Sequence, residues 1–397
     1  MKLQRVLLLF IILISLLLNG CTAGREINTL GIVISVGIDK SASGYMVTYQ
    51  VLNPRAIAAT KPTNEAPIFS YTETGKDLFE IKRKMTEESP RKMYHSHLRT
   101  VVLSEEVAKE GIKGILDFFT RGHEYRTDFY FLIARDTTAK NILNTISPLE
   151  SVSGLELFHS LETSERAWAP TKTIKVYELV NALNSKGNNP VLTGVASHEA
   201  DGSSNSLDAL KQSDPPKIKL AGLGAFKKDK LAGWLTEDES KGYSYITGNV
   251  KSTAGYILYH QNRITFEVTK SDSKVKAYIL NGKPAINVKL NLETDISAST
   301  GSIDLTNEAT IDKLRILIAE RIKNLCYGAL NRTKNDLGTD IFGFGEEIHK
   351  KYPKLWKNLS EDWNNEFVKL PVNINVKADI NGLGENTRSV VLSEGNN

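Results

Sequence analysis

The chain has 397 residues, of which 41% are hydrophobic and 24% are charged, and its formal net charge is +4. This balance is ordinary for a globular protein and gives no reason to expect nucleic acid as a partner. The two cysteines exclude a framework of several disulfides. Since the length exceeds that of one typical core, we expect two or three domains.

The first residues have the pattern of a lipoprotein signal peptide. Two basic residues precede an apolar run at 6–18, which is short for a membrane span but suits the hydrophobic region of a signal peptide. The run ends in the letters LNGC, which resemble the bacterial lipobox, where the cysteine receives a diacylglycerol group and becomes the new N-terminus. We expect a signal peptide at 1–20 and lipidation at Cys21, whose two acyl chains would form a stable anchor. The alternative is an uncleaved anchor with an incidental cysteine.

Cleavage before Cys21 would leave a chain with a net charge of about +2. No second apolar run approaches the length of a membrane span. We therefore expect the body of the protein to lie outside the cytoplasm, tethered to the membrane by its lipid.

Residues 21–200 are predicted to form an N-terminal α+β domain. It opens with two β-branched runs at 29–40 and 45–52, which indicate adjacent strands of a hairpin. Apolar spacing predicts a helix that ends at Pro90 and a helix at 105–119. Further strands are expected at 95–104, 128–134 and 190–199, and short helices are expected around residue 141 and at 176–183.

A polar segment at 201–216, rich in Ser, Asp and Pro, is the best candidate for a linker or long loop. Residues 217–255 are then predicted to form a small middle domain of a hairpin and a helix. Two apolar runs around the polar stretch 227–230 indicate the hairpin. Thr236 and Glu239 have the spacing of a capping box for the helix.

Residues 256–392 are predicted to form a C-terminal α+β domain. It begins with an antiparallel meander of three strands, and a long helix, two shorter helices and a final strand follow. Because strands and helices are segregated, the expected class is α+β, in three domains with mixed or antiparallel sheets flanked by helices. The meander strands are expected at 263–270, 274–281 and 285–294, the long helix at 307–330, the shorter helices around 342–357 and the last strand at 370–382.

His95-Ser96-His97 is the most tempting metal pattern. On a strand, residues two apart point to the same face, so both imidazoles could meet one ion. A zinc site needs a third and usually a fourth ligand, and no neighbouring Asp, Glu or Cys has a familiar spacing. We therefore favour polar strand residues and predict no metal site. Cys326 lies near the apolar face of the long helix, so we expect a buried, inert thiol.

No catalytic set stands out elsewhere. Gly222-Leu223-Gly224 begins like a dinucleotide-binding loop, but Lys227 takes the place of the third glycine and no βαβ unit surrounds it. Nucleophile elbows, phosphate loops and Cys-x-x-Cys motifs are absent. We predict neither enzymatic activity nor a cofactor. The aromatic and lysine residues of 342–357 favour packed helices over a surface for anionic lipid or a protein partner.

Five stretches, taken together, are similar to one family. Their order and spacing resemble the Ger(x)C family, the C-subunit lipoproteins of the nutrient germinant receptors of spore-forming Gram-positive bacteria. The resemblance covers nearly the whole chain, and Asn19 in the lipobox is its one departure. The stretches are REINTLGIVISVGIDK at 25–40, YMVTYQVLNP at 45–54, HSHLRTVVLSEEVAKEGI at 95–112, GLGAFKKDKLAGWLTEDESKGY at 222–243 and DIFGFGEEIHKKYPKLWK at 340–357.

The resemblance implies a location, partners and a role. Such a protein would be held by lipid on Cys21 at the outer face of the spore inner membrane. It would assemble with two polytopic subunits, A and B, which together sense small nutrients and trigger germination. The family is of α+β type, in three domains and without enzymatic activity. No residue that contacts a nutrient can be carried over, so nutrient contact would be indirect or unknown.

Two other functions stay open. A solute-binding lipoprotein of a transporter would show repeated parallel βα units in two lobes, which the predicted meander disfavours. A cell-wall hydrolase would need positioned carboxylates or a metal, for which His95 and His97 are the only signal.

Overall fold

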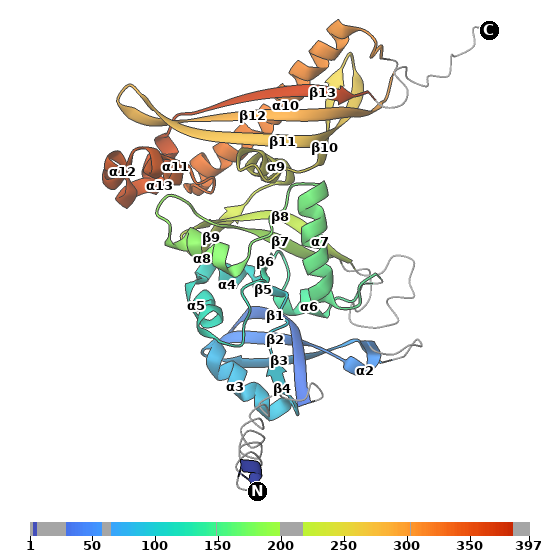
Figure 1. Ribbon diagram of the computed structural model, residues 1–397, viewed down its shortest axis with the longest axis vertical. Coiled ribbons are helices and arrows are strands. Elements are labelled where there is room, and N and C mark those ends of the chain that lie inside the picture. Colours follow the sequence, from blue (N-terminus) through green and yellow to red (C-terminus); the bar gives the residue numbers. More distant parts are fainter. Residues whose placement is uncertain are drawn as a thin grey trace, which may run out of the picture.

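The computed structural model describes residues 3–5, 29–57, 65–147, 149–198, 217–301 and 303–383. Within this part of the chain, two sheets follow one another along the long axis of the molecule, each with helices against it (Figure 1). The protein is α+β, as expected. Most of the expected signal peptide, Cys21 and the linker at 201–216 lie outside the described residues.

The larger sheet has nine strands and occupies the lower part of Figure 1. Its order is β3-β2-β1-β5-β6-β7-β8-β9, and the short β4 pairs with the start of β1. Neighbours are parallel from β1 through β5 and β6 to β7, and antiparallel at both ends of the sheet. The strands are β1 (Leu30–Ser41), β2 (Gly44–Leu52), β3 (Ile68–Gly75), β4 (Lys92–Tyr94), β5 (Thr100–Ser104), β6 (Tyr130–Ala134), β7 (Val191–His198), β8 (Lys217–Lys227) and β9 (Lys230–Trp234).

Apolar clusters lie on both faces of this sheet. Successive residues of a strand point to opposite faces, so Phe131 and Ile133 of β6 join one cluster and Leu132 joins the other. The continuous run YFLIA of β6 is typical of a parallel strand that is buried on both faces. The helices around the sheet are α2 (Pro54–Ile57), α3 (Leu78–Glu88), α4 (Glu105–Glu110), α5 (Lys113–Arg121), α6 (Ala139–Asn144), α7 (Ser153–Ala167) and α8 (Val176–Asn184).

Several boundaries differ from those predicted. The predicted helix at 105–119 is two helices, because Gly111 adopts a φ of 132°, which favours glycine, and ends α4. The predicted strand at 95–104 begins only at Thr100, so the histidine motif lies in the connection between β4 and β5. Strand β3 and helix α7 have no counterpart among the predicted elements.

The hairpin of β8 and β9 continues the larger sheet. β7 pairs antiparallel with β8 from Val191↔Ala225 to His198↔Lys217, so the chain on either side of the expected linker shares one sheet. The division into three domains stays a prediction. In α9 (Glu237–Ile246) the capping box is confirmed, because Thr236 and Glu239 exchange side-chain to backbone hydrogen bonds of 2.8 and 3.3 Å.

The second sheet has the order β10-β11-β12-β13, antiparallel except that β13 runs parallel to β12. Helix α10 packs against it and against α9, and Ile318, Ile322 and Cys326 lie on its buried face. The elements are β10 (Thr253–Tyr259), β11 (Asn262–Leu280), β12 (Lys283–Ser299), α10 (Glu308–Asn331), a π-helical turn η3 (Arg332–Leu337), α11 (Phe344–Lys351), α12 (Pro353–Leu359), a 3₁₀ turn η4 (Ser360–Asp362), α13 (Trp363–Lys369) and β13 (Val372–Gly382).

The predicted meander is wrong in its first two strands, 263–270 and 274–281, which form one continuous strand, β11. Residues 271–273, expected to be a turn, continue β11 and pair with 290–292 of β12, just after a register shift between Val268 and Lys270. β10 is an additional strand. The expected turn at Asn281-Gly282 is confirmed, since both residues have positive φ, 49° and 77°. Among the described helices, none is both long enough and apolar enough to cross a membrane.

Candidate functional site

Asp340 is fully buried and organises the loop that leads into α11. Its Oδ1 accepts hydrogen bonds from the backbone N–H groups of Phe342 (3.0 Å) and Gly343 (3.1 Å). Its Oδ2 accepts from the N–H of Gly345 (2.9 Å) and from Trp363 Nε1 (3.0 Å). Burial raises the pKa of Asp340 to about 6, although these hydrogen bonds lower it. The carboxyl group therefore fixes the turn at Gly343, where φ is 75°.

The same loop binds the larger sheet. The backbone N–H of Asn189 donates to the carbonyl oxygen of Asp340 (2.7 Å), and Asn189 Oδ1 accepts from the N–H of Lys228 (2.7 Å). The hydroxyl of Thr339 donates to the carbonyl oxygen of Phe226 (2.7 Å). The start of β7 and the β8–β9 hairpin are thus both joined to the loop before α11.

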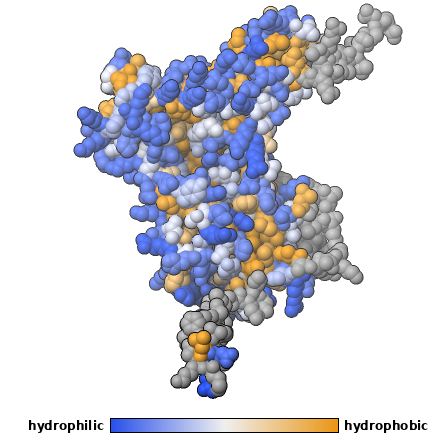
Figure 2. Space-filling model, in the orientation of Figure 1, coloured by the Kyte–Doolittle hydropathy of each residue, from blue (hydrophilic) through white to orange (hydrophobic). Residues whose placement is uncertain are grey.

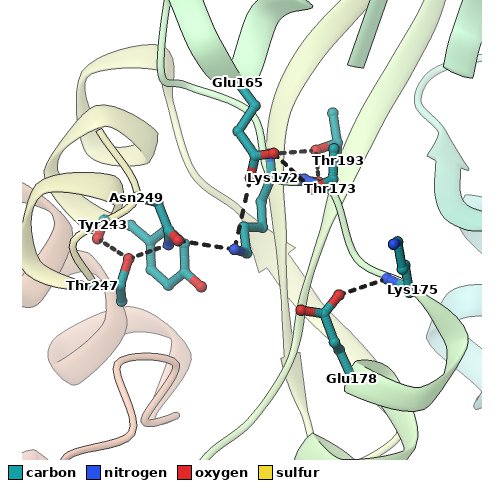
Figure 3. A network of polar contacts seen from close by, with 9 residues as sticks. All are labelled: Glu165, Lys172, Thr173, Lys175, Glu178, Thr193, Tyr243, Thr247 and Asn249. Carbon is teal, nitrogen blue, oxygen red and sulfur yellow. Dashed lines mark hydrogen bonds and ion pairs between the residues drawn. The ribbon is translucent and has the colours of Figure 1, made fainter. Parts of the chain in front are cut away.

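A second polar bridge crosses between the two parts of the molecule (Figure 3). Lys172 Nζ donates to Asn249 Oδ1 (2.9 Å) and lies 3.7 Å from Glu165 Oε1. Asn249 Nδ2 donates to the hydroxyl of Thr247 (2.6 Å), which donates to the carbonyl oxygen of Tyr243 (2.8 Å). Because α9 packs on α10, this chain of contacts connects the segment after α7 with the second sheet unit.

The contacts of Asp340 with Asn189 and of Lys172 with Asn249 form the polar junction of the two sheet units. An open cleft of about 580 Å³ lies at this junction, between α8, α9, β11 and α11. Its mostly polar lining contains neither His nor Cys, so it can bind by hydrogen bonds but holds no thiol or imidazole for catalysis. Throughout the described residues, no three His, Cys, Asp or Glu gather into a possible metal site. The polar lining includes Glu178, Asn181, Asn188, Thr247, Ser273 and Glu347.

His95 lies in an aromatic cluster. Its ring centroid is 5.6 Å from that of Tyr49 and 4.9 Å from that of Tyr125, and its Nδ1 is 3.7 Å from Glu124 Oε2, too far for a hydrogen bond. Burial lowers the pKa of His95 to about 3, so the ring is neutral at physiological pH. His97 is exposed, so the two imidazoles do not face one ion.

A second open groove, of about 500 Å³, lies between α3 and α5. Phe79, Phe118 and Tyr125 line it. The charges on its rim are satisfied within the protein, since Arg121 Nε lies 2.7 Å from Asp117 Oδ2. Lys82 pairs with Glu124 (2.9 Å), and Asp77 accepts hydrogen bonds from the N–H groups of Phe79 and Glu80, so the groove offers mainly apolar contact.

The aromatic and lysine-rich stretch at 342–357 forms packed helices, as favoured. Phe342, Phe344 and Trp356 are buried in the core. Lys350 reaches solvent and pairs with Glu347 (2.8 Å). These three aromatic side chains hold α11 and α12 against the core, so they are not available for a partner, whereas Tyr352 is half-buried.

Of the two cysteines, only Cys326 lies among the residues that the structure describes. Cys21, the predicted lipidation site, lies outside the described residues, so its modification stays a prediction. Cys326 is fully buried in α10, as expected, and burial raises the pKa of its thiol, which disfavours the reactive thiolate.

Asp340 and Asn189 are the residues of this site that sequence reasoning missed. Asp340 stands before a glycine-containing turn and a helix, which is a weak sign of a carboxylate that organises a loop. Asn189 lies 151 residues away from it, so no local pattern could have paired the two.

Two family models match the chain in succession. The model described as "Spore germination protein N-terminal domain" matches residues 24–197, and the model described as "Spore germination B3/ GerAC like, C-terminal" matches residues 221–384. Together the two matches leave out only the N-terminal segment, the expected linker with the first residues of β8, and the C-terminal end. The junction described above therefore lies where the two matched regions meet.

Curated relatives are similar along the whole chain. Spore germination protein KC of Bacillus subtilis is 28% identical over 394 residues, covering 96% of each chain. Spore germination protein B3 of the same organism is 23% identical and covers 89% of this chain and 91% of its own. The crystal structure of the GerBC protein matches 87% of this chain and 96% of its own, with a TM-score of 0.55 and 18% identity, which supports the fold.

Proposed function

Since the chain belongs to the Ger(x)C family of spore germination proteins, we propose that it is a non-enzymatic lipoprotein subunit of a spore nutrient germinant receptor. One observation carries the proposal. Both family models match in order, from residue 24 to residue 384, so the likeness extends over both sheet units. The polar junction supports a role in contact between proteins, because its hydrogen bonds join the two sheet units.

In this proposal the lipid on Cys21 holds the protein at the outer face of the spore inner membrane. There it assembles with the polytopic A and B subunits and couples or stabilises them, and its contact with the nutrient is indirect. The anchor raises the local concentration of the protein at the membrane, which strengthens weak contacts without new chemistry.

A pull-down of the tagged full chain from detergent-solubilised spore inner membranes tests this proposal. We expect mass spectrometry to find two polytopic subunits in the eluate and a diacylglyceryl group on the Cys21 peptide. Cys21→Ala should lower the recovery of both subunits at least about tenfold, because the second binding event loses its tether. Thr22→Ala, which keeps the thiol, is the matched control and should behave as wild type.

Two results would contradict the proposal. Normal membrane retention and normal germination of Cys21→Ala would remove the role of the anchor. Recovery of the lipidated protein with a transporter ATPase and permease would favour the solute-binding lipoprotein instead.

A further inference from the structure

Strand β3 forms an open edge of the nine-stranded sheet. It stands last in the strand order and pairs with β2 over its full length, from Leu52↔Ile68 to Tyr45↔Gly75, without a register shift. Within the described part of the chain, no strand pairs with its other side. The outward N–H and C=O groups of such an edge can pair with a strand of another polypeptide.

The opposite edge of the same sheet is closed. At β9, the carbonyl oxygen of Trp234 accepts a hydrogen bond from Arg332 Nε (3.3 Å), and Leu337 packs on Gly233. Just before β9, the carbonyl oxygen of Asp229 accepts from the N–H of Ile112 (2.9 Å). The fold therefore covers one edge with helical segments, whereas β3 has no such cover in the described residues.

The sequence of β3 also lacks the usual protection of an edge. Natural edge strands carry lysine, proline or a bulge, which discourage pairing with other chains. The sequence IFSYTETG has neither lysine nor proline, and its ladder has no bulge. Its only charge is Glu73, which lies in no close ion pair within the described residues but attracts Lys84 of α3. Phe69 is 48% exposed.

The two faces of β3 differ in chemistry. Tyr71 pairs with the buried Tyr49 and Phe69 pairs with Val51, so these aromatic side chains lie on the face that α3 covers. On the other face, the Ser70 hydroxyl donates to Asn144 Oδ1 of α6 (2.6 Å). A strand that fits this edge has apolar residues on one face and small polar residues on the other, with a basic residue near Glu73.

The position of β3 indicates where such a strand comes from. Leu30 opens β1 nine residues after Cys21, a stretch that spans at most about 30 Å. Ile68 pairs with Leu52, at the end of β2 that lies beside the start of β1. With the lipid on Cys21, this short tether keeps the first residues of β3 within reach of the membrane surface.

We propose that the β3 edge accepts an extended segment of a membrane-embedded partner subunit as an additional strand. The inference rests on the proposed function, because it takes the lipid anchor and a membrane partner as given. Main-chain hydrogen bonds supply the affinity, and the alternating side chains of β3 supply the specificity.

Photo-cross-linking in spores that carry the tagged full chain tests the edge. p-Benzoylphenylalanine replaces Phe69 or Thr74, both exposed on β3, and in the control it replaces Tyr177, which is 51% exposed on α8. We expect a cross-link from each β3 position to a polytopic subunit and none from Tyr177. The same eluate reports whether the polytopic subunits co-purify without cross-linking.

The outcomes separate the two proposals. Co-purification without a cross-link from β3 overturns the proposed strand addition at β3 and leaves the proposed function unaffected. A cross-link only to a second copy of the chain overturns the proposed occupant. Absence of the polytopic subunits from the eluate overturns the proposed function and, with it, this inference.

Blocking the edge gives a second readout. Phe69→Lys and Thr74→Lys place a lysine on the open strand and should lower recovery of the partner roughly tenfold, the effect of about 1.4 kcal/mol. Tyr177→Lys is the matched control and should have no effect. An unchanged thermal midpoint of the purified variants excludes unfolding as the cause, and wild-type recovery of both β3 variants would overturn the proposal.

Discussion

At the scale of single residues, burial decides what a side chain can do. His95 has a neighbour in sequence, His97, that suggests a metal pair, yet the fold buries one ring and exposes the other. Glu124, the carboxylate nearest to His95, is instead paired with Lys82 (2.9 Å) and Lys92 (2.8 Å). The neutral imidazole of His95 thus packs between the rings of Tyr49 and Tyr125.

The neutral His95 makes the protein sensitive to acid. Its pKa is about 3 when folded and 6.5 when unfolded, so protons bind the unfolded chain first as the pH falls below 6.5. This difference lowers the free energy of unfolding by about 2 kcal/mol between pH 8 and pH 5. His95→Phe should lose about 2 kcal/mol less of its free energy of unfolding than the wild type does between pH 8 and pH 5. Urea unfolding at a series of pH values measures this difference.

His97→Phe serves as the control for this prediction. The exposed side chain of His97 makes no comparable buried contact, so the variant should keep the acid sensitivity of the wild type. Equal pH slopes for His95→Phe and the wild type would contradict the assigned role of His95.

Contacts between residues close in sequence could be predicted, and contacts between distant residues could not. The capping box of Thr236 and Glu239 could be predicted, because its two partners are three residues apart. Asp340 could not, because Trp363 and Asn189, which bind it, come from distant parts of the chain. The burial of Cys326 could be predicted, since the helical period alone places it near the apolar face.

At the scale of elements, the crossing of α9 and α10 depends on one glycine. A Cβ atom on Gly242 would lie 2.1 Å from the carbonyl oxygen of Leu325 and 3.1 Å from the Cβ atom of Ala329. Both neighbours belong to α10, and one of them is backbone, so neither can move away easily. The two helices can therefore approach closely only while position 242 has no side chain.

Gly242→Ala should destabilise the protein by about 3 kcal/mol, because it overpacks this crossing. The matched control is Gly328→Ala, also in a helix, where an added Cβ atom meets nothing within 4 Å. That substitution should stabilise the protein by about 1 kcal/mol, the helix preference of alanine over glycine. Chemical denaturation measures both, and equal effects of the two substitutions would contradict the close crossing.

Among the elements, strongly periodic ones were predictable and edge strands were not. The 24-residue α10 follows its apolar spacing almost to the residue. β3 was not predictable, because half of its residues are polar and its pattern contains no buried stripe. The polar residues Ser271, Asp272 and Ser273 suggested a turn, yet they continue β11, because each still has a partner on β12.

At the scale of the whole molecule, the two sheet units share one core. A single apolar cluster extends from Val33 in β1 to Ile380 in β13. The pairing of β7 with β8 carries the larger sheet across the expected linker, and Asn189 and Lys172 join the two units by hydrogen bonds. The sequence could not reveal this continuity, because a polar linker between two strands does not indicate whether they pair.

The shared core predicts one cooperative unfolding transition. Differential scanning calorimetry of the chain should show a single peak in which the calorimetric and van't Hoff enthalpies agree. Far-UV circular dichroism and tryptophan fluorescence should give the same midpoint, since Trp234 lies in the larger sheet and Trp356 in the α11–α12 region. Two separated peaks would mean that the two units unfold independently and that the junction is weak.

The order of strands in both sheets also bears on how the chain is made. In the larger sheet, each strand after β1 pairs with a strand that precedes it in sequence, first outward to β3 and then from β5 to β9 on the other side, and in the second sheet the same holds for each strand after β10. During synthesis, therefore, every strand other than β1 and β10, which open the two sheets, finds a neighbour already present when it emerges. The longest interval belongs to β13, since 300–371 must emerge before it can join β12 and complete the second sheet.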